Sequence, residues 1–429
     1  MLSRSTPFSR AYKNYVLAVL TAVYTLSTCD LNLMSLLLEP IKQDLRLSDA
    51  QLGFLTGIAF GFFYATLGLP FARWADRGNR STIASISIAL WGATVMLCVA
   101  VRSFSQLVLA RMAAAIGESG CMPPTYSLVG DYFPEPAGRA RAMTIYMTAS
   151  PLPSLLSFLA GGWLNAHYGW RLTFFFMGIP GLLIAILVKV TVAEPRHHYA
   201  SSGERAVTSP GVMQVLRNLW RQPSSRHLSL GVILLLTFGW GLFPWYAAFM
   251  IRSHGMSVQE LGIWLGGVFG IGGIAGTLLG GYIADRCFPG DERSQMRLNS
   301  WLIASLVIWF GLFLLLPQKR YALTALVPLV VIFNFSFGPT FALMQRLVAD
   351  NVRATAMALV MLLANLIGMG VGPQLVGVLS DLLHPSLGTD SLRYAMLIVS
   401  LLSLWTAFHF RRVGNTVMRD LNALSRLQR

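Results

Sequence analysis

The chain has 429 residues, of which 55% are hydrophobic and only 12% are charged, and its mean hydropathy is +0.58. Soluble domains carry roughly 25% charged residues, so this composition argues against a soluble protein and favours one whose surface faces lipid. The net charge of +15 does not indicate nucleic-acid binding, because the basic residues sit in short loops between apolar segments and not along one face.

Twelve segments are candidates for membrane spans, since a spanning helix needs about 20 apolar residues. In chain order they lie near 15–38, 50–72, 83–101, 106–132, 142–170, 172–188, 228–251, 261–284, 298–318, 321–345, 354–380 and 394–410. The first and fourth are interrupted by ionisable residues, and 142–170 includes an outer turn. The pattern predicts an all-α membrane protein with twelve transmembrane helices.

The basic residues predict the orientation of these spans. If the N-terminus is inside, the inner segments hold most of the lysines and arginines and the outer segments hold few. This bias is typical of cytoplasmic loops. We therefore expect a multi-pass protein of the inner (plasma) membrane of bacterial type, with both termini in the cytoplasm.

The longest polar segment divides the spans into six and six. We predict an N-terminal six-helix bundle over 1–189, a cytoplasmic linker loop over 190–227, a C-terminal six-helix bundle over 228–411 and a cytoplasmic tail over 412–429. The halves resemble each other: Asp76-Arg77 and Asp285-Arg286 lie 209 residues apart, and "RARAM" (139–143) matches "RATAM" (353–357). Repeats of this kind place a substrate site between two halves that rock to give alternating access.

Two loops carry a family signature, "ARWADRGNR" (72–80) and "GYIADRCFPGDER" (281–293). They resemble the conserved loops of major facilitator superfamily transporters, although Ala72 stands where that family usually has glycine. The resemblance implies that these acid–base pairs hold helix ends together in one gating state. The alternative is that these charges only set the orientation of the protein in the membrane. The predicted gating residues are Asp76, Arg77, Arg80, Arg139, Asp285 and Arg286.

Within that superfamily the N-terminal third is most similar to the Spinster-like branch. The similar segments are "SLLLEPIKQDLRLSDAQLGFLTG" (35–57), "FYATLGLPFARWADRGNR" (63–80) and "LARMAAAIGESGCMPPTYSLVGDYFP" (109–134). That branch usually has Asp-Arg in its first helix, whereas here Asp30 is followed by Leu31. The resemblance implies that the matching acid and arginine take part in proton coupling and substrate binding.

Asp30, Arg111 and Glu118 fall well inside predicted spans. A charge at the bilayer centre costs at least ~2.5–3.5 kcal/mol, so such residues normally face a cavity or a partner. Asp30 lies eight residues before Leu38, the predicted outer end of its helix, and Arg111 lies eight residues after Ser103, the predicted outer start of its helix. The two side chains are therefore expected at the same depth in the membrane, so an ion pair between them is reasonable. Glu118 lies two turns beyond Arg111, too far for direct pairing.

We expect Glu118, with Asp30, to bind and release the proton, and Arg111 to offer a fixed positive charge to the substrate. Gly117, Ser119 and Gly120 are expected to leave room for water or substrate beside Glu118. The alternative is a structural role, in which Glu118 is protonated and bonded to a neighbouring helix. Aromatic and amide side chains of the C-terminal half are further candidates for substrate contacts: Trp240, Tyr246, Asn334 and Asn365.

The glycine-rich segment 262–281 is expected to form a packing and sliding surface, because its glycines allow helices to approach closely. Two proline-containing segments, "SPLPS" (150–154) and "GPQLVG" (372–377), are predicted to be kinks or hinges.

Together these features predict a secondary active transporter that moves a small amphipathic organic molecule, an organic anion or lysolipid, by proton-coupled alternating access. A non-transporting membrane sensor and a drug or lipid exporter are the alternatives. The chain shows no Walker, HExxH or GxSxG motif, so we expect no ATP-driven pump and no enzyme. We expect no cofactor, metal or nucleic acid to bind. The expected partners are the substrate, protons and the bilayer, and the protein is expected to be a monomer.

The cysteines make no CxxC pair and are expected to be free: Cys29, Cys98, Cys121 and Cys287.

Overall fold

The computed structural model describes residues 8–198, 212–348 and 352–427. Every regular element within these ranges is a helix, which confirms the all-α prediction. The chain forms two compact units: unit 1 comprises Met1–Leu47, Ala59–Arg205 and Ser257–Gly266, and unit 2 comprises Ser48–Ile58, Ala206–Met256 and Gly267–Arg429. Each unit therefore receives one short segment from the opposite half of the sequence.

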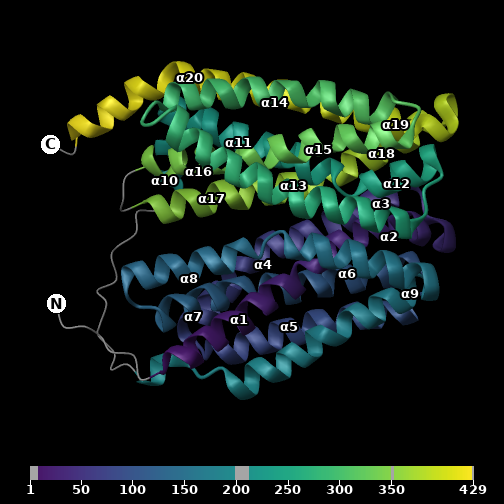
Figure 1. The fold of residues 1–429 in the computed structure, drawn as a ribbon, viewed down its shortest axis with the longest axis horizontal. Coiled ribbons are helices and arrows are strands. Elements are labelled where there is room, and N and C mark those ends of the chain that lie inside the picture. Colours follow the sequence, from purple (N-terminus) through teal and green to yellow (C-terminus); the bar gives the residue numbers. More distant parts are fainter. Residues whose placement is uncertain (1–7, 199–211, 349–351, 428–429) are drawn as a thin grey trace. The chain divides into compact units, whose positions relative to one another are not determined.

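Unit 1 is built mainly from the helices of the first half (Figure 1). They are α1 (Arg10–Ser27), α2 (Cys29–Leu45), α4 (Ile58–Arg77), α5 (Arg80–Leu97), α6 (Phe104–Ser119), α7 (Met122–Tyr132), α8 (Pro136–Thr148) and α9 (Leu152–Thr191). The backbones of α5 and α9 meet at glycines, since a Cβ on Gly178 would lie 2.6 Å from the carbonyl oxygen of Gly92. Small residues at such crossings are the usual means of helix packing in membranes.

Unit 2 holds α3 and the helices of the second half (Figure 1). They are α3 (Asp49–Thr56), α10 (Val212–Arg221), α11 (Pro223–Leu242), α12 (Trp245–His254), α14 (Glu292–Leu315), α15 (Lys319–Phe335), α16 (Phe337–Arg346), α17 (Arg353–Asn365), α18 (Gly372–Leu387), α19 (Ser391–Ser400) and α20 (Leu402–Leu427). Helix α13 (Val258–Cys287) begins in unit 1 and continues in unit 2.

The predicted spans correspond to helical stretches, several of which are interrupted or merged. Nine stretches of the described chain are long and apolar enough to cross a membrane; Ala137–Thr191 covers two predicted spans, and so does Thr355–Ala423. The predicted span near 106–132 is built from α6 and α7, with a break after Ser119. Helix α9 merges two spans across Gly169, whose φ of 75° is left-handed and suits glycine.

The predicted hinge at 150–154 coincides with the break between α8 and α9. The second predicted hinge is displaced: the irregular turn is a π-helix over Leu366–Val371, directly before Gly372. Single π-turns inside α-helices are often found at functional sites, and this one starts next to Asn365.

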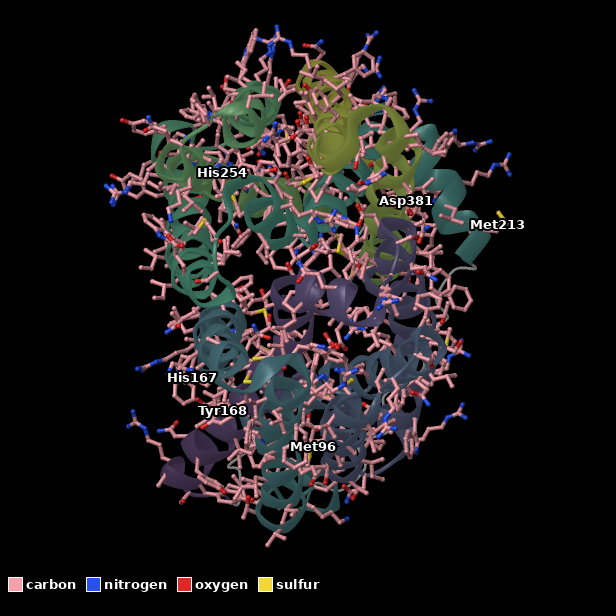
Figure 2. All side chains as sticks on the ribbon, turned by 90° about the vertical axis from the view of Figure 1, so that its right-hand side faces the viewer. Met96, His167, Tyr168, Met213, His254 and Asp381 are labelled. Atoms are coloured by element: carbon pink, nitrogen blue, oxygen red, sulfur yellow. The ribbon has the colours of Figure 1, made fainter. Side chains whose placement is uncertain are left out.

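The helix of the first predicted span ends later than expected, and two segments predicted to connect or follow the bundles contain helix. The first span does not end near Leu38, because α2 continues to Leu45 and Arg46 ends it in a left-handed conformation. The predicted linker loop 190–227 contains helix α10, whose Val215 is buried and whose Met213 projects outward (Figure 2). The predicted tail from 412 onward is the continuation of α20, and its Val413 is fully buried.

Candidate functional site

An ion pair joins α2 and α6 in the interior of unit 1. Nη1 of Arg111 donates to Oδ2 of Asp30, and the two side chains are only 2% and 1% exposed. Asp30 is the second residue of α2, where a carboxylate is favoured by the positive end of the helix dipole. The guanidinium lies over the ring of Phe60, 4.8 Å from its centre, a cation–π contact. The pairing expected from the sequence is therefore present.

This pair is only partly satisfied by the protein. Among the described residues, Oδ1 of Asp30 and both Nε and Nη2 of Arg111 have no hydrogen-bond partner. A buried charged atom without a partner costs free energy, so such groups are usually retained for a function that uses them. The arrangement leaves two donors and one acceptor available for another polar group.

Glu118 lies on the same helix and is equally buried, with 1% of its side chain exposed. Its Oε2 has no hydrogen-bond partner among the described residues, and the carboxyl interacts electrostatically with both Asp30 and Arg111. Helix α6 ends at the next residue, Ser119, so Glu118 lies beside the break that separates α6 from α7. Three ionisable side chains of unit 1 thus form one interior cluster.

The glycines beside Glu118 lie at close contacts with neighbouring helices. A Cβ on Gly117 would lie 2.6 Å from the amide nitrogen of Trp91, and one on Gly120 would lie 2.3 Å from the hydroxyl of Ser87. Gly117 therefore lets α6 approach α5 closely, whereas Gly120, which follows the end of α6, lies against Ser87 of α5 and Phe71 of α4. The room expected for water or substrate beside the carboxyl of Glu118 stays a prediction.

Tyrosines from four helices lie in the same interior region of unit 1, and sequence reasoning missed them. Tyr24 and Tyr64 lie within electrostatic range of Glu118. The ring of Tyr146 lies 5.2 Å from the rings of both Tyr24 and Tyr126, and its hydroxyl shares a 2.8 Å hydrogen bond with Thr125. No local pattern marks these tyrosines, because they come from α1, α4, α7 and α8 and meet only in the fold.

The predicted contact residues of the second half lie in unit 2. Trp240 is half-buried and contacts Phe243 edge-on, Asn334 donates to the carbonyl of Val330 at 2.9 Å, and Asn365 is half-buried beside the π-turn. Tyr246 belongs to the packed core, since it is 6% exposed and its ring contacts four phenylalanine rings. The structure thus favours a packing role for Tyr246.

Most of the predicted gating residues are exposed in this structure. They are Asp76, Arg77, Arg139, Asp285 and Arg286. Arg139 donates from Nε to the carbonyl of Phe133 at 3.4 Å. Exposure at helix ends agrees both with a gating role and with charges that only set the orientation of the protein in the membrane.

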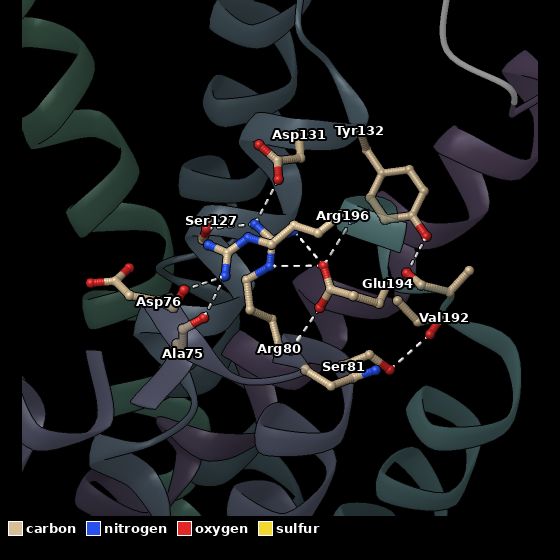
Figure 3. A network of polar contacts seen from close by, with 12 residues as sticks. Ala75, Asp76, Arg80, Ser81, Ser127, Asp131, Tyr132, Val192, Glu194 and Arg196 are labelled. Atoms are coloured by element: carbon tan, nitrogen blue, oxygen red, sulfur yellow. Dashed lines mark hydrogen bonds and ion pairs between the residues drawn. The ribbon is translucent and has the colours of Figure 1, made fainter. Parts of the chain in front are cut away.

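Arg80 differs, because it is 1% exposed and forms the centre of a polar network (Figure 3). Its Nε donates to Oε1 of Glu194 at 3.0 Å, its backbone N–H donates to Oε2 at 2.6 Å, and its Nη1 lies 2.7 Å from a carboxylate oxygen of Asp131. Arg196 donates to the carbonyl oxygens of Ala75 and Asp76 at 3.0 and 2.6 Å. The network ties the start of α5 to α7 and to the segment after α9.

A related ion pair occurs in unit 2 with its charges exchanged. Glu292 at the start of α14 pairs with Arg346 at the end of α16. Arg80 and Asp131 occupy the corresponding ends of α5 and α7 in the first half of the sequence. The two halves have kept an ion pair at this junction while reversing which helix carries the positive charge.

Comparison with known proteins identifies the family to which this fold belongs. The chain belongs to the Major Facilitator Superfamily, whose family model matches residues 20–373. It is therefore a multi-pass membrane protein of a transporter family, and the predicted twelve-helix major facilitator fold is confirmed.

Individual relatives extend over nearly the whole chain. An MFS-type efflux pump of Mycolicibacterium smegmatis is 34% identical over 413 residues, covering 94% of this chain and 93% of the relative. Protein spinster homolog 1 of Xenopus tropicalis is 26% identical over 425 residues, covering 90% and 78%. The crystal structure of a bacterial homologue of the human lysosomal transporter Spinster, inward-facing and unoccupied, matches with a TM-score of 0.85 and 28% identity, covering 96% and 99%. The resemblance to the Spinster-like branch is thus confirmed.

The Asp30–Arg111 pair generates a prediction for stability. Asp30→Asn leaves a buried arginine without its counter-charge and should destabilise the protein by about 3–5 kcal/mol, as should Arg111→Gln. The double variant removes both charges and should recover much of that loss. Thermal unfolding in detergent measures all three; losses that simply add in the double variant would argue against the contact.

Glu194, outside the membrane-spanning segments, generates a prediction for pH dependence. Burial alone would raise the pKa of Glu194, but the hydrogen bonds and charge of Arg80 outweigh it and hold that pKa below its usual value. Its stabilising contribution is therefore complete above the unfolded pKa of about 4.3 and is lost as the pH falls through the folded value.

We expect Glu194→Gln to lower stability at pH 7 by about 1.5–3 kcal/mol, the range for hydrogen bonds to charged groups. The difference from wild type should shrink below about pH 4. Glu135→Gln, at an exposed glutamate near the same end of α7, is the matched control and should show neither effect. A stability loss in Glu194→Gln that stays constant down to pH 3 would contradict the assignment.

Proposed function

We propose that this chain is a proton-coupled secondary transporter whose interior cluster of Asp30, Arg111 and Glu118 binds substrate and exchanges protons. The observation that carries the proposal is the set of buried charged atoms in unit 1 that have no hydrogen-bond partner among the described residues. Residues of this kind inside membrane proteins commonly mark substrate and proton pathways. The membership of the Major Facilitator Superfamily supports transport as the activity.

Within this proposal each charged residue has a separate task. Arg111 keeps its charge throughout, and its Nε and Nη2, which have no partner among the described residues, can donate forked hydrogen bonds to an anionic group of the substrate. Glu118 and Asp30 take up and release the proton, which changes the local charge by one unit where charge is costly. Because these groups interact electrostatically, a proton on one alters the binding of an anion by another.

The surroundings support an amphipathic substrate. Tyr24 and Tyr64 are half-buried and bring aromatic rings with hydroxyl groups within electrostatic range of Glu118, and the half-buried Tyr126 interacts with both of them. An organic anion or a lysolipid combines the anionic and apolar parts that such a lining would receive. From unit 2 we include Trp240, Asn334 and Asn365 as further contacts, and we retain the exposed loop charges as the gating set.

Export is the direction supported by the efflux pump of Mycolicibacterium smegmatis, which is 34% identical. We further propose an inner-membrane location with cytoplasmic termini, from the bias of basic residues, and a monomer as the working form. A sensor without transport activity is the competing function, and a flux assay separates the two.

The test is transport in proteoliposomes under an imposed pH gradient, with lysophosphatidylglycerol and a naphthalene carboxylate as probes. Wild-type protein should move at least one probe with the gradient. Glu118→Gln cannot exchange a proton at this position, so gradient-driven movement should fall to the level of protein-free liposomes. Exchange of labelled for unlabelled probe without a gradient should persist.

Glu135→Gln, which removes an exposed carboxylate, is the control and should transport as wild type does. Unchanged gradient-driven flux in Glu118→Gln would overturn the proton-exchange role. Absence of flux with every probe in the wild type would favour the sensor.

A further inference from the structure

Helix α10 lies at the ends of two candidate membrane spans of unit 2. It covers Val212–Arg221, and only Gln222 separates it from α11, whose span begins at Pro223. One residue reaches at most about 3.6 Å, so the end of α10 lies close to the end of that span. Helix α10 also contacts α17, where another candidate span begins at Thr355. Because it packs on both helices, α10 lies near the membrane surface.

Helix α10 has one face packed on the protein and one face uncovered. Val215 and Leu219 are buried, with 1% and 8% of their surface exposed. Met213 and Trp220 are 76% and 60% exposed, and Met213 projects outward (Figure 2). The two exposed side chains lie seven residues apart, which is about two helical turns, so they share the face opposite the buried pair.

Arginines lie on the same exposed face. Arg217 follows Met213 by four residues, Arg221 follows Arg217 by four residues, and both arginines are exposed. From the start of α11, Arg226 lies over the ring of Trp220, with its guanidinium carbon 6.0 Å from the ring centre. The sequence contains no acidic residue between positions 212 and 231. A methionine, a tryptophan and three guanidinium groups therefore gather on one surface, which we call the α10 surface.

The arginines of the α10 surface form no ion pair with any described residue. The ion pairs found in unit 2 use other arginines, namely Arg252, Arg346, Arg393 and Arg419. The carboxylate of Asp420 accepts from the backbone N–H of Ser224 at 2.9 Å and pairs with Arg419. The positive charge of the α10 surface is thus left for water or for an anion outside the described chain.

The combination of an exposed ring and an arginine recurs in unit 2. The guanidinium of Arg411 lies 5.8 Å from the ring centre of Trp301, and that of Arg412 lies 5.2 Å from that of Phe408. These rings are 68% and 48% exposed. Exposed aromatic rings beside cations are typical of the level of the lipid headgroups. Positive charge alone would set the orientation of a span, so the exposed rings need a further explanation.

The α10 surface fits the headgroup of an anionic phospholipid. Guanidinium groups donate forked hydrogen bonds to phosphate oxygens, and basic residues next to a span attract anionic lipids. Tryptophan is favoured where headgroups meet acyl chains, and the apolar side chain of Met213 extends the same face. A soluble acidic protein would match the charge, but it would not explain exposed apolar side chains beside the end of a span.

We propose that Met213, Arg217, Trp220, Arg221 and Arg226 form a binding site for the headgroups of anionic phospholipids in the cytoplasmic leaflet. The side of the membrane follows from the proposed orientation. The site uses neither the interior cluster nor a proton, so it is independent of the proposed transport mechanism. Bound lipid holds α10 on the ends of α11 and α17 and thereby restrains the start of α11 at the membrane surface.

Hydrogen–deuterium exchange of the purified protein tests this site in two kinds of nanodisc. One contains phosphatidylcholine alone, and the other contains equal parts of phosphatidylcholine and phosphatidylglycerol. In the wild type the amides of α10 should exchange about tenfold more slowly in the anionic discs, as expected for several arginines at a charged surface. Peptides of α14 should exchange at the same rate in every sample, which shows that the protein is folded.

Two double variants separate charge from helix stability. Arg217→Gln with Arg221→Gln removes two of the positive charges and should abolish most of the difference between the discs. Arg217→Lys with Arg221→Lys keeps the charges and should retain most of it. The matched control is Lys319→Gln with Arg320→Gln, which removes two charges from exposed residues at the start of α15, also in unit 2. This control should keep the full difference.

Polyglutamate added to the phosphatidylcholine discs represents a soluble acidic partner and should leave the exchange of α10 unchanged. Protection by polyglutamate equal to that by phosphatidylglycerol would assign the α10 surface to an acidic protein and overturn the lipid site. The proposal is equally wrong if wild-type α10 exchanges at one rate in both discs, if the glutamine variant keeps the difference, or if the lysine variant loses as much of it as the glutamine variant.

Discussion

The cost of charge inside a membrane is the constraint on which this structure depends. A lone ionised side chain at that depth is strongly disfavoured, so a chain that keeps Asp30, Arg111 and Glu118 in its spans must pair them or use them. One bond joins Asp30 to Arg111, while Oδ1 of Asp30, Nε and Nη2 of Arg111 and Oε2 of Glu118 have no hydrogen-bond partner among the described residues. A cluster that is held in place yet incompletely satisfied is suited to bind an ionic ligand and a proton in turn.

The cluster of Asp30, Arg111 and Glu118 lies next to breaks in the helices. Asp30 lies in the first turn of α2, after the break at Thr28, and Glu118 directly precedes the break between α6 and α7. Gly117, next to Glu118, lets the backbone of α6 approach that of α5 closely. In the other unit a π-turn follows Asn365, and Gly57 separates α3 from α4. Broken helices, and not continuous ones, carry the residues proposed to function.

Features that follow from a local rule could be predicted from the sequence. Features that depend on contacts between distant segments could not. Helical class, span positions and the Asp30–Arg111 pair follow from apolar length and from the cost of buried charge. The end of the first span was wrong, because helix α2 continues past Leu38 through polar residues that hydropathy counts as a loop. Tyr24 and Tyr64, which lie near Glu118, come from helices distant from it in the sequence and carry no common pattern, so nothing local could have predicted that they meet.

The most direct measurement of the central claim is the solvent accessibility of position 118. In a variant with Glu118→Cys and the four native cysteines replaced, a membrane-impermeant thiol reagent is applied to one side of the membrane and then to the other. The account predicts labelling from each side, in different conformers, and protection by a transported probe. A second protein that retains only Cys287, which is exposed, serves as the positive control. If Cys287 reacts while position 118 stays unlabelled from both sides, the cluster is a sealed structural feature and the proposed transport mechanism is wrong.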